Sequence, residues 1–215
     1  SYGIYNGSSN TQVFNTSIIN NDGTGLYAYG GLYVNVNVAN NTGIGVYASN
    51  GAQFTNCHIV KNLYNNNSST TGAGVSNGNN GTNQFTNCVI WGNKTKNNRV
   101  NISGTNATYA YCAVEGGVDG TANITLDTLN SGDEPGAYYP NFTNPSDTAG
   151  AVGNYHYDYT LAAGSACINQ GIANTTSLNL PMYDLAGSLR IKQGRIDIGA
   201  YEYGGLIVNR VSDTI

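Results

Sequence analysis

Carboxylates, histidines and cysteines are the side chains of this chain that could do chemistry, and they are few and unevenly placed. Only one of the 12 acidic residues, Asp22, precedes residue 115. Acid–base hydrolysis of a glycosidic bond needs two carboxylates that face one cleft. Residues 1–114 cannot supply such a pair, so we predict that no catalytic residue lies there.

A further group of carboxylates follows along the chain: Glu115, Asp119, Asp127, Asp133 and Glu134. A site among them is conceivable, but carboxylates in loops are usually solvated. The two histidines, His58 and His156, belong to no evident Ser/His/Asp or Cys/His arrangement. The sequence therefore predicts no catalytic residue, no metal site and no cofactor, and it favours a protein that is not an enzyme.

The elements that must position these residues follow from a nine-residue pattern that recurs five times. It occupies residues 13–21, 33–41, 54–62, 85–93 and 109–117, with starts 20, 21, 31 and 24 residues apart. The first, fourth and sixth positions are mainly apolar, and the third and ninth are each Asn four times. A fixed period of this size is typical of a solenoid, in which each repeat buries its apolar edge by stacking on its neighbours.

A second pattern precedes four of these segments. It reads Gly-Ile-Tyr, Gly-Leu-Tyr, Gly-Val-Tyr and Gly-Val-Ser at residues 3–5, 25–27, 45–47 and 74–76. Each repeat therefore holds at least two short strands, and the Gly and Asn residues between them suit sharp corners. We predict an all-β fold, a right-handed parallel β-helix of four or five coils over residues 1–117. An irregular capping segment, 118–203, and a tail, 204–215, complete the expected organisation.

The fourth position of the pattern predicts one inward column, which holds three of the four cysteines. Its members are Thr16, Val36, Cys57, Cys88 and Cys112. We interpret these cysteines as free thiols that act as small core residues, with a disulfide between adjacent coils as the alternative. A metal site is disfavoured because the chain has no CxxC pair and His58 falls in an adjacent, outward position.

Three tyrosines are the candidates for ligand binding. Tyr5, Tyr27 and Tyr47 each follow an inward aliphatic residue, so they should point outward in a row about 4.8 Å apart. Such a strip can pack against sugar rings, or it can stabilise its own strands by aromatic stacking. Both interpretations stay open at the level of sequence.

Composition excludes two classes of partner. Charged residues make up 9% of the chain and the formal net charge is -4. Only Lys61, Lys94, Lys96 and Arg99 are basic before residue 190, too few for a stripe that follows nucleic-acid phosphates. No apolar run approaches 18 residues, so we predict no transmembrane segment. The chain begins inside a repeat, and we take it to be a mature or truncated piece.

The second half resembles a known family. Residues 114–117 read VEGG, 159–171 read YTLAAGSACINQG, 184–190 read DLAGSLR and 197–202 read DIGAYE. This order resembles the C-terminal part of large secreted bacterial parallel β-helix proteins of the choice-of-anchor Q type, which are abundant in Bacteroidetes. The resemblance covers roughly residues 109–203. It implies a pectin-lyase-like fold, secretion and attachment to the cell surface, but no enzyme activity.

Arg190 is the natural partner for the carboxylates of these last motifs: Asp184, Asp197 and Glu202. A guanidinium can hold carboxylates with planar geometry and would join the final loops of the cap. The alternative is a catalytic arginine with acidic partners. We favour the structural role, because partly buried Arg–carboxylate clusters are a common structural device.

The resulting expectation is a secreted or cell-surface structural or adhesive protein that contacts polysaccharide or other surface proteins. Two alternatives stay open, a noncatalytic end of a polysaccharide lyase or hydrolase and a subunit of an extracellular fibre that associates end to end. Three Asp-Thr-aliphatic tripeptides look like acceptors of Bacteroidetes protein O-glycosylation and make candidates of Thr128, Thr148 and Thr214.

Overall fold

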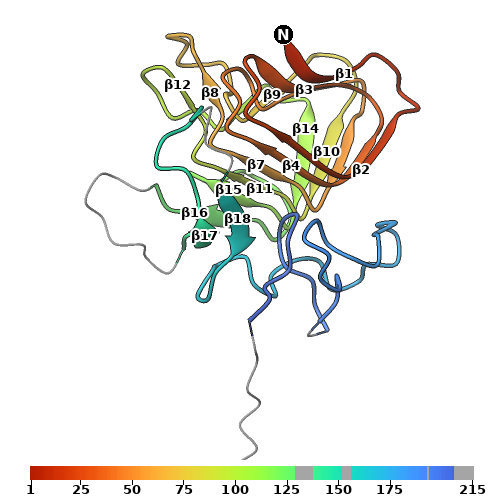
Figure 1. Cartoon of the computed structure of the whole chain (residues 1–215). Coiled ribbons are helices and arrows are strands. Elements are labelled where there is room, and N and C mark those ends of the chain that lie inside the picture. Colours follow the sequence, from red (N-terminus) through yellow and green to blue (C-terminus); the bar gives the residue numbers. More distant parts are fainter. Residues whose placement is uncertain (129–137, 152–155, 193, 206–215) are drawn as a thin grey trace, which may run out of the picture.

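The computed structural model describes residues 1–128, 138–151, 156–192 and 194–205, and none of these residues lies in a helix. The described chain is all-β and most of its strands are parallel (Figure 1). The first sheet runs in the order β1 (Tyr2–Asn6), β3 (Thr24–Tyr29), β5 (Val46–Ser49), β9 (Val75–Asn77) and β13 (Ile102–Ser103). One strand of each successive repeat builds this sheet.

The second sheet has nine strands, because the nine-residue pattern supplies it with one long strand or two short ones. Its order is β14 (Ala107–Ala110), β10 (Asn83–Thr86), β6 (Gln53–Thr55), β4 (Leu32–Ala39), β7 (His58–Val60), β11 (Val89–Trp91), β15 (Ala113–Glu115) and β16 (Ile124–Leu126), with β2 (Gln12–Ile19) pairing beside β4. Two small sheets pair β12 (Lys94–Thr95) with β8 (Leu63–Tyr64) in parallel, and β17 (Phe142–Asn144) with β18 (Asp158–Leu161) antiparallel.

Register follows the sequence pattern position by position. Tyr33 pairs with Val13 on one side and with Phe54 on the other, and Phe54 pairs in turn with Phe85. Equivalent residues of consecutive repeats therefore lie beside one another, which is consistent with a β-solenoid.

The asparagines of the third position form the bend that divides the longer strands. Asn15, Asn35, Asn56 and Asn87 have φ between 48° and 55°, as does Tyr111 in the fifth repeat. This left-handed conformation is disfavoured for most L-residues but accessible to asparagine. The eighth position makes a second corner with Asn20, Asn40 and Lys61, and Gly takes over at residues 92 and 116.

The ninth position builds a ladder of buried amides along the stack. The Nδ2 atom of Asn21 donates to Oδ1 of Asn41 at 2.8 Å, Asn41 donates to Asn62 at 2.9 Å, and Asn62 donates to Asn93 at 2.9 Å. Asn93 continues to Asn101, whose amide donates to the carboxylate of Glu115 at 2.8 Å. Because buried polar groups are costly without partners, the ladder fixes how the repeats align.

Apolar side chains fill the interior between the two sheets. The rings of Tyr33, Phe54, Phe85 and Tyr109 stack in sequence with centroids 4.7 to 5.0 Å apart. Leu26, Val46 and Val75 face them from the five-stranded sheet and belong to the same buried cluster. This cluster is the main core of the described chain.

The segment expected to cap the stack packs along its side instead. Residues from Tyr139 onward build a second buried cluster on the outward face of the nine-stranded sheet, over Ala39, Val60, Val89 and Ala113. In Figure 1 the blue C-terminal segment lies alongside this sheet, whereas β16 continues the stack beyond β15. The placement follows from apolar outward positions, which need cover. Among the described residues no helix is long and apolar enough to cross a membrane.

Candidate functional site

The three predicted tyrosines form a row on the five-stranded sheet. Tyr5 pairs with Tyr27, and Tyr27 pairs with Tyr47, across β1, β3 and β5. Their outward direction follows from the strand period of two, because the preceding residues of β3 and β5, Leu26 and Val46, are fully buried in the core. The structure thus brings together residues that lie 20 or more positions apart in the chain.

The rings of this row stack on one another. The Tyr5 and Tyr27 centroids are 4.8 Å apart at an interplanar angle of 17°, and those of Tyr27 and Tyr47 are 5.1 Å apart at 7°. Tyr2 adds a ring edge-on to Tyr27 at 5.7 Å. Burial, and secondly the neighbouring Tyr5, raises the pKa of the Tyr27 hydroxyl, which therefore stays a neutral donor and acceptor.

This geometry changes what the row can offer a ligand. The sequence left open a strip that packs against sugar rings or a row that stacks on itself, and the observed face-to-face stacking turns most ring faces toward one another. The outward surface consists of ring edges and hydroxyls, and Tyr5, which is 63% exposed at the end of the row, presents the most open ring. The row can therefore donate and accept hydrogen bonds along its length and make apolar contact with a ligand at Tyr5.

The inward column is buried as predicted in four of its five positions. Val36, Cys57, Cys88 and Cys112 belong to the main core and are at most 1% exposed, whereas Thr16 in the first repeat is half-buried. All four cysteines of the chain are free thiols. Burial raises the pKa of Cys88 well above its ordinary value, so this thiol is a core residue and not a nucleophile.

Arg190 connects the final loops to the stack. Of its three predicted carboxylate partners, Glu202 is the one with which it forms an ion pair. Its Nη1 forms an ion pair with Oε1 of Glu202 at 2.8 Å, and its Nη2 donates to Oδ1 of Asn35 at the bend of the second repeat. Asp184 and Asp197 instead accept backbone N–H groups: Asp184 from Ser188 at 2.7 Å, and Asp197 from Asn169 at 2.6 Å. Burial raises the pKa of Glu202 to about 7 despite the nearby guanidinium.

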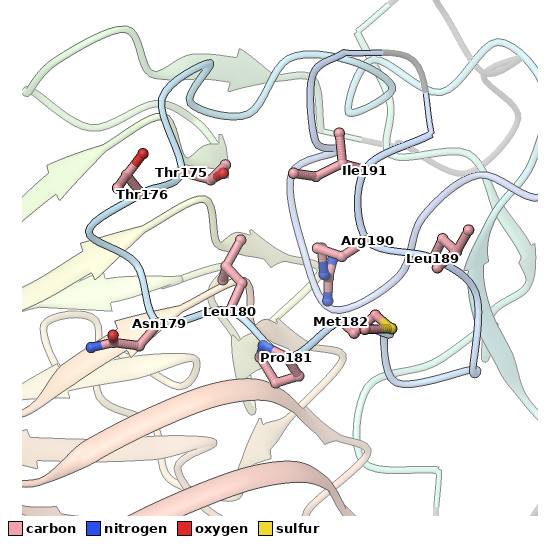
Figure 2. Close-up of a pocket in the computed structure, with 9 residues that line it drawn as sticks. All are labelled: Thr175, Thr176, Asn179, Leu180, Pro181, Met182, Leu189, Arg190 and Ile191. Atoms are coloured by element: carbon pink, nitrogen blue, oxygen red, sulfur yellow. The ribbon is translucent and has the colours of Figure 1, made fainter.

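A hollow of about 420 Å³ lies beside this cluster. Thr175, Leu180, Met182 and Ile191 are among the residues that line it, and Arg190 forms part of its wall (Figure 2). Met182 is 69% exposed. No carboxylate or histidine lines the hollow, so its walls offer no acid–base pair.

His58 points outward, as its position in the pattern predicts. It is nevertheless fully buried, because the C-terminal segment covers it. Phe142 and Tyr201 pack against its ring with centroids 5.2 Å away, and neither ring nitrogen has a hydrogen-bond partner. Burial, with Arg190 nearby, lowers the pKa of His58 to about 3. Val89 and Ala113 stand at equivalent positions of later repeats; their apolar character was the signal that this face is covered.

Of the five carboxylates from residue 115 to residue 134, the structure describes three, and they differ in burial. Glu115 is buried, where it accepts from the backbone N–H of Gly92 at 2.8 Å and pairs with Arg99 at 3.0 Å. Asp119 and Asp127 are exposed, and residues 133 and 134 lie outside the described residues. No group of three or more metal-ligating side chains occurs in the part of the chain that the structure describes.

The three threonines predicted as glycosylation acceptors differ in access. Thr148 is exposed and Thr128 is half-buried, with its carbonyl accepting from the Tyr139 hydroxyl at 3.3 Å. Thr214 and the apolar tail around it lie outside the described residues. Thr148 is therefore the more accessible of the two candidates that the structure describes.

Comparison with protein-family models, with curated proteins and with solved structures finds no match to this chain. Its class is therefore defined by its own structure: an all-β chain of stacked parallel strands, with an outward tyrosine row on one sheet and a C-terminal segment packed against the other.

Proposed function

We propose that this chain is a noncatalytic structural module of a secreted or cell-surface protein, built as a right-handed parallel β-helix. The observation that carries the proposal is the continuity of its ladders: one asparagine ladder and one inner aromatic stack each run through successive repeats. Each repeat is held by its neighbours and not by local contacts alone. Such a stack is stiff and suits a spacer that projects from a surface.

Digestion with proteinase K under native conditions tests this role. A continuous stack should leave a large fragment that contains strands β1 to β16, while a heat-denatured sample should be digested fully. Rapid loss of all large fragments from the native sample would contradict a rigid module.

Export is supported by the motifs at residues 184–190 and 197–202, which resemble those of secreted β-helix proteins. Labelling of intact native cells with a membrane-impermeant biotin reagent tests it. We expect the protein to be labelled or to occur in the medium; protection until the cells are lysed would refute export. The other interpretation, a noncatalytic end of a polysaccharide lyase or hydrolase, predicts the same localisation. The sequence of the full gene distinguishes the two, because that interpretation requires a catalytic domain in the same protein.

Adhesion to glycans is a second proposed function, and the tyrosine row is the observation that favours it. Exposed phenol edges with hydroxyls in register suit the repeated hydroxyl groups of a polysaccharide. Affinity gels or a glycan array with Tyr27→Ala and Tyr47→Ala test it. If the native protein retains no polysaccharide, or if both variants bind equally well, the row serves only its own sheet.

The strand order also supports association of the chain end to end with a second copy of itself. β1 and β2, both in the first repeat, each lie at an edge of the pairing order, and a strand edge can pair with a further strand of this protein or of another copy. Light scattering after size exclusion should then show a mass that rises with concentration. A monomer at all concentrations would remove the fibre interpretation.

A further inference from the structure

A second hollow, of about 370 Å³, lies at the corner between the two sheets. Three consecutive repeats line it, through residues 9–12, residues 31–32, and residues 50, 51 and 53. Its polar side chains are hydroxyls and amides: Ser9, Asn10, Thr11, Gln12, Asn50 and Gln53. None of the residues that line it is charged.

The four side-chain amides of the hollow make no hydrogen bonds within the described chain. They belong to Asn10, Gln12, Asn50 and Gln53. Gln12 and Gln53 pair with Leu32 from either side, so they are two strand spacings apart, about 10 Å. Both are exposed, and the side chain of Leu32 lies between them as an apolar contact.

The chemistry of this hollow suits a ligand with many hydroxyl groups and no charge. Each side-chain amide offers donors and an acceptor together, which matches the mixed donor and acceptor character of vicinal hydroxyls. A phosphate or uronic acid would need a cation or a helix dipole, and residues 1–60 contain a single charged side chain, Asp22. An apolar residue between amides suits the C–H face of a sugar ring.

The hollow and the tyrosine row belong to the same three repeats. In each repeat the tyrosine precedes a lining residue by four positions: Tyr5 precedes Ser9, Tyr27 precedes Gly31, and Tyr47 precedes Gly51. Four residues of extended chain span about 13 Å, so the two surfaces are neighbours around one corner. A ligand several sugars long can contact both.

We propose that this amide hollow is a binding subsite for a strand of uncharged polysaccharide. The proposal rests on the glycan adhesion proposed above and deepens it, because it places the polar recognition at Gln12 and Gln53 and leaves the tyrosine row as an adjoining contact. Gln12 and Gln53, which lie on alternate repeats, would hydrogen-bond to a polysaccharide chain that runs along the direction of stacking.

Calorimetry with uncharged hexasaccharides of glucose, xylose and mannose tests the subsite. For the sugar that binds, the double variant Gln12→Ala and Gln53→Ala should lose at least tenfold in affinity. Gln84→Ala is the matched control, since Gln84 is the exposed neighbour of Gln53 one repeat further and lies outside the hollow. It should stay within twofold of the native chain, and all variants should melt at the native temperature because the side chains are exposed.

Each outcome separates the two proposals. Unchanged affinity in the double variant overturns the subsite, and if Tyr27→Ala still weakens binding, glycan adhesion through the row survives. Equal loss in the double variant and in Gln84→Ala also overturns it, as does tighter binding of hexagalacturonic acid. Absence of binding to every hexasaccharide would overturn both.

Discussion

Protonation of His58 should release the C-terminal segment from the stack. The imidazole lies between the nine-stranded sheet and that segment, with Phe142 and Tyr201 on its ring and Arg190 as the nearby cation. Neither nitrogen has a partner, so a charged ring would have no compensating contact. The folded chain therefore binds no proton here at a pH where the unfolded chain does.

The size of the effect follows from the two pKa values. The pKa is 6.5 in the unfolded chain and about 3 in the folded one. At 1.36 kcal/mol per unit, the neutral ring contributes about 5 kcal/mol that is present above pH 6.5 and lost as the pH falls to 3. Between pH 6.5 and pH 4.5 the loss is about 2 kcal/mol. Burial raises the pKa of Glu202 to about 7, so its stabilising effect has the opposite sign and is lost as the pH rises.

The assay is urea unfolding between pH 4.5 and pH 7.5 for the native chain and for His58→Leu, which has no titrating group at this position. Glu202 titrates in both proteins, so its effect cancels in the difference. The free energy of unfolding of the native chain should fall by about 1.4 kcal/mol more per pH unit below pH 6.5 than that of the variant. Parallel pH profiles would refute the burial of a neutral, unpartnered imidazole.

Three further substitutions test the packing, each by thermal or urea unfolding. Ile59→Asp should cost more than about 4 kcal/mol, because it places a carboxylate in a fully buried column; an unchanged melting temperature would contradict the column. Asn56→Ala should cost at least about 1 kcal/mol, because alanine tolerates φ 51° poorly and the hydrogen bond from the Asn56 side-chain amide to the Gly199 carbonyl is lost. A variant as stable as the native chain would show that asparagine at this bend does not stabilise the fold. Arg190→Met should cost about 3–5 kcal/mol, because it leaves the buried Glu202 carboxylate without its partner, and adding Glu202→Met should recover part of this loss. A double variant less stable than Arg190→Met would show that the unpaired carboxylate does not explain the loss.

Strand register was predictable because the same residue types recur at the same positions of each repeat. Asparagine at the third position and an apolar residue at the sixth recur, and parallel stacking is the arrangement that puts like residues beside one another. The tyrosine row followed from the same pattern, since an outward residue after an inward one has a fixed direction. The stacking of the rings also follows from strand spacing, and it was one of the two interpretations of the row that the sequence left open.

The covering of one face could not be predicted from the repeats alone. The segment around Phe142 and Ile198 has no period of its own, and its docking depends on side chains distant in sequence, such as Val60 and Val89. The motifs of residues 184–202 pointed to a cluster around Arg190. Nothing in them indicated that Arg190 reaches Asn35, 155 positions away.

The parallel, in-register stacking of the repeats is tested most directly by NMR couplings across hydrogen bonds. The structure requires the backbone N–H of Val89 to donate to the Cys57 carbonyl and that of Ala113 to donate to the Cys88 carbonyl, each at 2.9 Å. We expect both nitrogen–carbonyl couplings in isotope-labelled protein, without reciprocal partners, as in parallel pairing. Reciprocal couplings between directly opposed residues, or couplings shifted by a residue, would contradict the stack and every site placed on it.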